Sequence, residues 1–139
     1  MLIPVFKLNR VALLAVVFCW CTALFAQQAQ PKRVRFIDKT AMERTEIIVS
    51  VLKVRLSLTA EQEPKIKEIV LASEKQRELD IKANKGNKEA MENARKRRNA
   101  AETAEFRKIL TAEQMKIYNK NRLDIRNEVL KQAGVKVEE

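Results

Sequence analysis

The side chains that could bind a ligand or partner are mainly arginines and lysines. The chain has 28 Lys and Arg residues against 18 Asp and Glu residues, and its densest basic run is Ala94 to Arg98. Such a run attracts anionic partners over a Debye length of about 8–10 Å. The alternative interpretation is a solvated helix face, held by intrahelical pairs such as Glu92 with Lys96.

Groups suited to covalent or metal chemistry are scarce. The sequence contains no histidine, and both cysteines, Cys19 and Cys21, lie in an N-terminal segment that we expect to be removed. The rest of the chain then has no imidazole base, no thiol nucleophile and no soft metal ligand. With two glycines it cannot form a Gly-rich phosphate loop. We expect a protein that is not an enzyme and has no cofactor or metal.

Residues 1–26 have the pattern of a secretory signal. Lys7 and Arg10 precede an apolar stretch that ends at Ala26. Cleavage after Ala26 is expected, with Ala23 as the alternative site. A retained anchor is the competing interpretation, although the stretch is shorter than the ~20 residues that span a bilayer. Cleavage predicts a periplasmic protein.

The segments that flank the expected domain are short and polar. Removing the leader takes away Lys7 and Arg10 and no acid, so the formal charge falls from +10 to +8. Residues 27–37 are expected to form a flexible basic arm, either a solvated leader or a segment attracted to anionic lipid or an acidic partner. At most peripheral membrane contact is therefore expected. Residues 134–139 are expected to be a frayed tail.

One five-residue phrase, LTAEQ, occurs twice, at 58–62 and at 110–114. A Thr followed three residues later by Gln is a capping box, in which each side chain bonds the other's backbone N–H. The preceding Leu can pack on the first turn of the helix. Each phrase therefore predicts a helix start. The predicted cap residues are Leu58, Thr59, Gln62, Leu110, Thr111 and Gln114.

Residues 38–133 are expected to form one all-α domain. Ala, Glu, Lys, Arg, Leu and Ile dominate this part of the chain, and it shows no strand-like alternation. Pro64 is expected about five residues into its helix, where it would forfeit one backbone hydrogen bond. The four expected helices run from a cap at Asp38 to Leu56, from the first LTAEQ to Lys85, from Lys88 to Ile109, and from the second LTAEQ to Ala133.

The paired phrases, the expected leader and the basic charge resemble the LTXXQ motif family, the Spy/CpxP-like periplasmic proteins. The resemblance covers roughly residues 38–132. It implies a small four-helix, elongated, cradle-like arrangement that forms an antiparallel homodimer. It further implies an ATP-independent holding chaperone for unfolded or misfolded envelope proteins. The alternative that it implies is a repressor of an envelope-stress sensor kinase, which would bind the sensor's periplasmic domain.

On the chaperone hypothesis, clients are expected to meet charged and apolar side chains together. The predicted client-binding residues are Ile66, Lys75, Arg77, Met91, Arg95 and Arg98. A nucleic-acid partner is not expected, because aromatic side chains for base stacking are scarce and the expected export argues against it. A sensor repressor would instead show one saturable partner with a defined stoichiometry.

Overall fold

The computed structural model describes residues 35–135, which belong to one compact unit, Arg33–Glu139. The predicted leader, most of the predicted arm and residues 136–139 lie outside the described residues. The described chain is helical between short connections, which confirms the predicted all-α class. Its elements are η2 (Phe36–Asp38, a 3-10 turn), α2 (Ala41–Leu56), α3 (Gln62–Ala83), α4 (Lys88–Ile109), α5 (Ala112–Lys120) and α6 (Arg122–Gln132).

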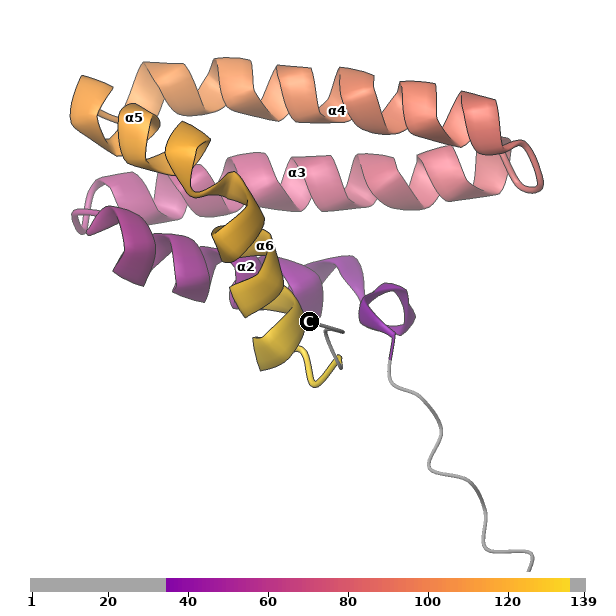
Figure 1. The fold of residues 1–139 in the computed structure, drawn as a ribbon, viewed down its shortest axis with the longest axis horizontal. Coiled ribbons are helices and arrows are strands. Elements are labelled where there is room, and N and C mark those ends of the chain that lie inside the picture. Colours follow the sequence, from indigo (N-terminus) through magenta and orange to yellow (C-terminus); the bar gives the residue numbers. More distant parts are fainter. Residues whose placement is uncertain (1–34, 136–139) are drawn as a thin grey trace, which may run out of the picture. The chain divides into compact units, whose positions relative to one another are not determined.

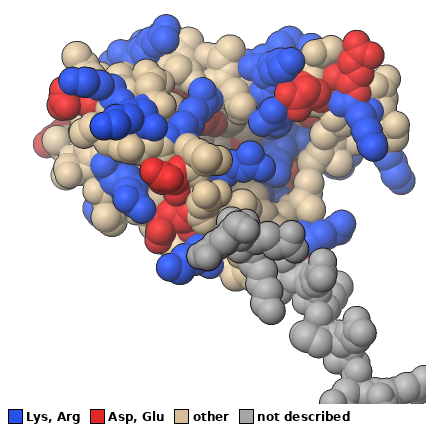
Figure 2. Space-filling model, viewed as in Figure 1, with Lys and Arg blue, Asp and Glu red and all other residues tan. Residues whose placement is uncertain are grey.

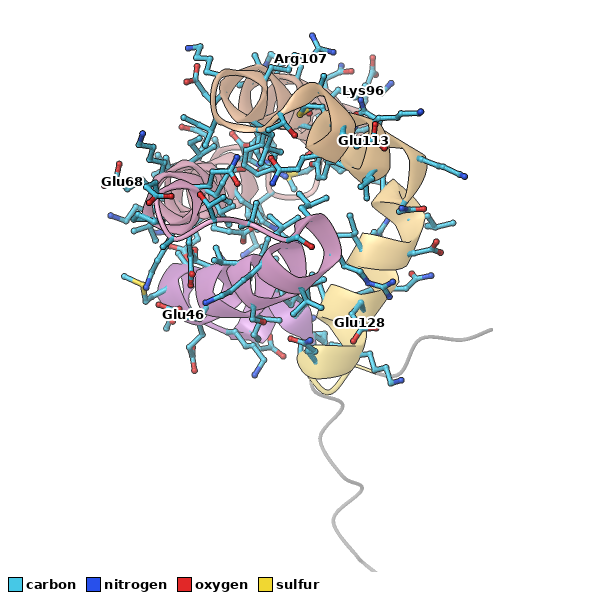
Figure 3. All side chains as sticks on the ribbon, turned by 90° about the vertical axis from the view of Figure 1, so that its left-hand side faces the viewer. Glu46, Glu68, Lys96, Arg107, Glu113 and Glu128 are labelled. Carbon is cyan, nitrogen blue, oxygen red and sulfur yellow. The ribbon has the colours of Figure 1, made fainter. Side chains whose placement is uncertain are left out.

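The two longest helices, α3 and α4, form an antiparallel hairpin (Figure 1). Helix α2 packs along α3, and the chain returns through α5 so that α6 packs on α2. Charged side chains such as Glu46, Glu68, Lys96 and Arg107 project from the outside of this arrangement (Figure 3). Among residues 35–135, none of the helices combines the length and apolar character needed to cross a membrane.

The hydrophobic core lies where α2, α3, the end of α4 and the last two helices meet. Leu52, Leu56, Ile66 and Phe106 are almost completely buried there. The Phe106 ring meets the Tyr118 ring edge to face, with centroids 5.3 Å apart, a favourable geometry for an aromatic pair. Helix α4 contributes little else, because Ala94 and Phe106 are its buried residues. Its polar middle therefore lies outside the core, as its composition predicts.

The predicted fourth helix is divided, so the described chain has five α-helices where four are predicted. The division falls at Asn121, between α5 and α6. Asn is a weak helix former, and the two parts have different partners. Helix α5 contacts both α2 and α4, with Tyr118 against Phe106, whereas α6 packs on α2. A straight helix would not bring both segments onto these two partners.

The start of the first helix also differs from the prediction. Thr40, and not Asp38, is the N-cap, and it forms a capping box with Glu43. The Glu43 amide donates to Thr40 Oγ1 at 3.2 Å, and the Thr40 amide donates to Glu43 Oε2 at 2.7 Å. Asp38 lies in η2 and pairs with Arg35. Thr followed three residues later by Glu is the same kind of signal as the Thr–Gln pairs of the two LTAEQ phrases.

Pro64 lies closer to its helix start than predicted. The regular helix begins at Gln62, so Pro64 is its third residue. Backbone N–H groups of the first turn have no intrahelical acceptor, so a proline at this position costs little. The Glu63 amide still donates to the Thr59 carbonyl at 3.1 Å. Because Pro64 has no N–H, the next hydrogen bond, to the Ala60 carbonyl, is missing, so the predicted loss of one backbone hydrogen bond stands, beside the turn that Thr59 begins.

Two helices end in left-handed backbone. Gly134 has φ +75° after α6, and the Val135 amide donates to the Leu130 carbonyl at 3.0 Å. Helix α2 ends in the same way at Ser57, with φ 50°, although this conformation favours glycine. The next residue, Leu58, is buried and donates its amide to the Lys53 carbonyl at 3.1 Å. The turn at Ser57 therefore directs Leu58, the first residue of the LTAEQ phrase, into the core.

Candidate functional site

The two LTAEQ phrases meet in space through their glutamines. Gln62 Nε2 donates to Gln114 Oε1 at 2.9 Å, and Gln114 Nε2 donates to Gln62 Oε1 at 3.0 Å. Each phrase also forms its predicted capping box, Thr59 with Gln62 and Thr111 with Gln114. We call these four residues the motif junction. The predicted caps are present, and the contact between them is a feature that the sequence did not indicate.

Each junction glutamine also satisfies the end of another helix. Gln62 Nε2 donates to the Ile109 carbonyl at 3.0 Å, and Gln114 Nε2 donates to the Leu56 carbonyl at 3.1 Å. The last carbonyls of a helix otherwise lack intrahelical donors. The predicted neighbours Leu58 and Leu110 are buried beside the junction. The junction therefore ties together the ends of α2 and α4 and the starts of α3 and α5, which is a structural role.

A groove of about 570 Å³ opens between the α3–α4 hairpin and the pair α2 and α6. Five arginines line it, together with eight Phe, Ile, Leu and Val side chains. Figure 2 shows Lys and Arg side chains in and beside a hollow on this face. We call it the arginine groove. Its arginines are Arg77, Arg95, Arg98, Arg122 and Arg126, and its carboxylates are Glu74 and Glu102.

Three of the predicted client-binding residues, Arg77, Arg95 and Arg98, line this groove. They also line a neighbouring cavity of about 410 Å³, where they are joined by a fourth predicted residue, Met91. The structure thus brings together four side chains that were selected as separate positions on two helices. Lys75 is exposed, and it does not line either cavity.

The sixth predicted residue, Ile66, does not belong to this surface. Its relative exposure is 0%, and it packs in the core with Val70 and Phe106. The prediction that Ile66 contacts a client is wrong for this fold, because the side chain offers no surface. Helix periodicity identifies an apolar face, but it does not distinguish a core residue from an apolar residue at the edge of a groove.

A buried ionic cluster lies beneath one wall of the groove. The Arg44 guanidinium of α2 is buried against the Glu74 carboxylate of α3, and it also bonds the Lys39 carbonyl. Its Nη2 reaches Glu78 Oε1 at 3.1 Å. Arg77 Nη1 lies 3.5 Å from the Glu74 carboxylate. We call Arg44, Glu74, Arg77 and Glu78 the ionic cluster, in which Arg44 and Arg77 compete for Glu74.

The basic run on α4 is partly neutralised along its length. Arg98 pairs with Asp80 of α3 at 2.5 Å, and both side chains are 12% exposed. Arg95 pairs with Glu92 at 2.6 Å, so Glu92 has Arg95 as its ion-pair partner where Lys96 was expected. Arg97 and Lys96 are exposed. One side of the run therefore faces the groove and the other faces solvent.

Two titratable groups in the groove wall have perturbed pKa values. Burial raises the pKa of Glu102, the nearby Glu74 carboxylate adds to the effect, and Arg122 and Arg98 oppose it. Burial also raises the pKa of Tyr118, and Glu102 contributes in the same direction. The guanidinium of Arg122 lies 5.5 Å from the centroid of the Tyr118 ring. The negative charge of Glu102 is thus disfavoured where several arginines converge.

Several groove residues were missed from the sequence. Arg122, Arg126 and Leu130 lie on α6, and the division of the last helix determines that they face the groove. Arg44 and Glu74 were missed because their pairing joins positions 30 residues apart. The sequence contains a weak signal for both. Arg44 lies on the apolar stripe of its helix with Ala41 and Ile48, and Glu74 follows Ile66 and Val70 on the apolar stripe of the next helix.

Within residues 35–135, no three His, Cys, Asp or Glu side chains converge in a way that could hold a metal ion. All buried side-chain nitrogen and oxygen atoms of the described residues have a hydrogen-bond partner. Comparison with known protein families, with curated proteins and with solved structures finds no match for this chain. The arginine groove is therefore the main structural indication of function.

Proposed function

We propose that this protein is an ATP-independent holding chaperone of the periplasm, which binds unfolded or aggregation-prone proteins in the arginine groove. The observation that supports the proposal most directly is the composition of that groove, with five arginines beside eight apolar side chains on a concave surface. Charge accelerates the encounter with an acidic segment. The apolar wall then retains the segment through weak, non-directional contacts.

The proposed location rests on the signal-like segment 1–26, and the proposed activity agrees with the resemblance of the LTAEQ phrases to Spy/CpxP-like proteins. The proposed arrangement is an antiparallel homodimer. Val54 of α2 is 77% exposed and Leu123 of α6 is 66% exposed, so both helices leave apolar surface for a second copy. Light scattering that shows a monomer at micromolar concentration would contradict the dimer.

The function can be tested by following the light scattering of an aggregating client without nucleotide, at several salt concentrations. Substoichiometric to equimolar protein is expected to suppress aggregation, and suppression is expected to weaken as salt screens the arginines. Absence of suppression at every ratio would reject the holding function. A saturable complex with a sensor's periplasmic domain would then become the expected activity.

Charge-matched variants locate the activity on the molecule. Arg122→Gln/Arg126→Gln removes two exposed arginines of the groove, whereas Arg97→Gln/Arg107→Gln removes two exposed arginines outside it. Only the groove variant is expected to lose suppression. Equal losses in both variants would indicate that net charge, and not the groove, determines client binding.

A further inference from the structure

Three guanidinium groups lie between the arginine groove and the neighbouring cavity. Arg77, Arg95 and Arg98 line both the arginine groove and the neighbouring cavity of about 410 Å³. Two of them have carboxylate partners at short distances, Arg95 with Glu92 at 2.6 Å and Arg98 with Asp80 at 2.5 Å. Such pairs fix the position of each guanidinium but leave N–H groups free for a second anion.

Arg77 is the least neutralised of the three. Its distance to the Glu74 carboxylate is 3.5 Å, and Glu74 is engaged by the buried Arg44. Its guanidinium lies 5.4 Å from the centroid of the Phe36 ring, which holds it in place. Burial lowers the pKa of Arg77; the Glu74 carboxylate opposes this effect, and the charges of Arg44 and Arg98 add to it. An anion at this point would offset the crowding of positive charge.

The rest of the groove is suited to a hydrocarbon chain. Ile48 and Leu52 of α2 and Ile125, Val129 and Leu130 of α6 line its wall, together with Arg122 and Arg126 of α6. The volume of about 570 Å³ lies within the range of about 300–1,000 Å³ that small-molecule sites occupy. A groove that combines arginines with apolar side chains is complementary to a molecule with one anionic head and one alkyl chain.

We propose that the arginine groove binds a single-chain amphiphilic anion, an alkyl carboxylate or alkyl phosphate. Its head is held by Arg77, Arg95 and Arg98, and its chain lies along the apolar wall of α2 and α6. Guanidinium groups bind both kinds of head through charge-assisted hydrogen bonds. This site goes beyond the holding function, because it needs no unfolded protein and has a defined stoichiometry of one.

The acid in the groove wall does not oppose this assignment. Glu102 lies among Ser73, Glu74, Arg98 and Arg122, and its raised pKa disfavours the negative charge that would repel an anion. The carboxylates on the outside of the fold, such as Glu46 paired with Lys67, are engaged elsewhere. With five arginines against Glu74 and Glu102, the lining of the groove keeps an excess of positive formal charge.

The experiment is a calorimetric titration of the purified protein with four probes, each below its micelle concentration. Dodecanoate and dodecyl phosphate are each expected to bind with a stoichiometry of one per protein chain. The probe with the higher affinity identifies the preferred head group. Dodecyltrimethylammonium is expected to bind at least about tenfold more weakly, since its head is repelled. Octanoate is expected to bind about two-hundredfold more weakly than dodecanoate, since it has four methylenes fewer and each buried methylene contributes about 0.8 kcal/mol.

Variants connect binding to the named side chains. Arg77→Gln is expected to lower the affinity for dodecanoate by about tenfold or more, because a charge-assisted contact is lost. Arg97→Gln, the same change on the solvent side of α4, is expected to leave affinity unchanged. Arg95→Gln serves as a second test if Arg77→Gln alters the circular dichroism or unfolding of the protein.

Three results would overturn the proposal. Equal affinity for the alkyl cation and the alkyl anions would show that the head is not recognised. Binding of many equivalents would show adsorption to apolar surface. Unchanged affinity in a folded Arg77→Gln or Arg95→Gln variant would place the head elsewhere. The aggregation assay can fail while this titration succeeds, so the two hypotheses are tested independently.

Discussion

Helix α3 takes part in two polar assemblies that differ in the charge of their side chains. At its start, Gln62 contributes to the motif junction, which is neutral and in which the amide groups of both glutamines are hydrogen-bonded. In its second half, Glu74, Arg77 and Glu78 contribute to the ionic cluster, which adjoins the arginine groove. The junction fixes helix ends through neutral amides and hydroxyls, whereas the ionic cluster pairs two arginines with two glutamates beside a cavity. The two ends of one helix thus use different kinds of polar contact.

Breaking the ionic cluster is expected to have the largest effect on stability. Arg44→Met keeps the volume of the side chain but leaves the Glu74 carboxylate without its buried partner. The expected cost in the free energy of unfolding is about 3–5 kcal/mol. Urea unfolding measures it.

The matched control is Arg55→Met on the same helix, where the ion pair with Glu128 is 3.6 Å long and exposed. Its expected cost is at most about 1 kcal/mol. The double variant Arg44→Met/Glu74→Leu is expected to recover much of the loss, because it removes both charges. Equal costs for Arg44→Met and Arg55→Met would show that the cluster is not buried as described.

Breaking the motif junction is expected to cost less. Gln114→Ala removes the side-chain acceptor of the Thr111 amide, both contacts with the Gln62 side-chain amide, and the donor to the Leu56 carbonyl. We expect a loss of about 2–3 kcal/mol in the free energy of unfolding. Since the junction is neutral, this loss is expected to be nearly independent of salt concentration.

A double-mutant cycle with Gln62→Ala sharpens the test. The two glutamines bond each other, so the cycle is expected to give a coupling energy of about 1 kcal/mol or more. Gln76→Ala, on the exposed side of α3, is the control and is expected to change stability by less than about 0.5 kcal/mol. Additive losses at Gln62 and Gln114 would contradict the reciprocal contact.

The wall of the groove is expected to make stability depend on pH. The folded protein holds the proton of Glu102 more tightly than the unfolded chain does, because its pKa lies above the ordinary value of 4.5. The stability that this proton contributes is present below that value and is lost as the pH rises through the folded pKa. Glu102→Gln is therefore expected to raise the melting temperature at pH 8 relative to the unmodified protein, with little gain at pH 4. A uniform change at both pH values would contradict the assignment.

The smallest expected effect is a gain beside the motif junction. Ser57 has φ 50°, in the left-handed region that favours glycine. Ser57→Gly is expected to raise the free energy of unfolding by about 0.5–1 kcal/mol. The control is Ser50→Gly within α2, which is expected to destabilise by a similar amount. A loss of stability in Ser57→Gly would show that the Ser57 side chain contributes more than the backbone strain costs.

The parts of the fold that local signals determine were predictable. The limits of α4 agree with prediction because a turn with Asn87 precedes it and the second LTAEQ phrase follows it. The division at Asn121 was not predictable, because it depends on two partners that only the folded chain defines. Likewise, a capping role already accounts for Gln62 and for Gln114, so nothing in the sequence indicates that the two side chains contact each other. Of the candidate site, the arginines of α3 and α4 were found and those of α6 were missed.

The sparse anchoring of α4 has a consequence for motion. Its buried residues are Ala94 and Phe106, and Phe106 lies at the core end, near the motif junction. Between Ala94 and the turn at Gly86, side-chain burial is slight. Backbone amides exchange with solvent through local opening, whose free energy falls with the apolar contact that must be broken. Hydrogen exchange along the α3–α4 hairpin is therefore expected to quicken steadily from Phe106 towards Gly86, so that the outer turns open while the core end stays closed.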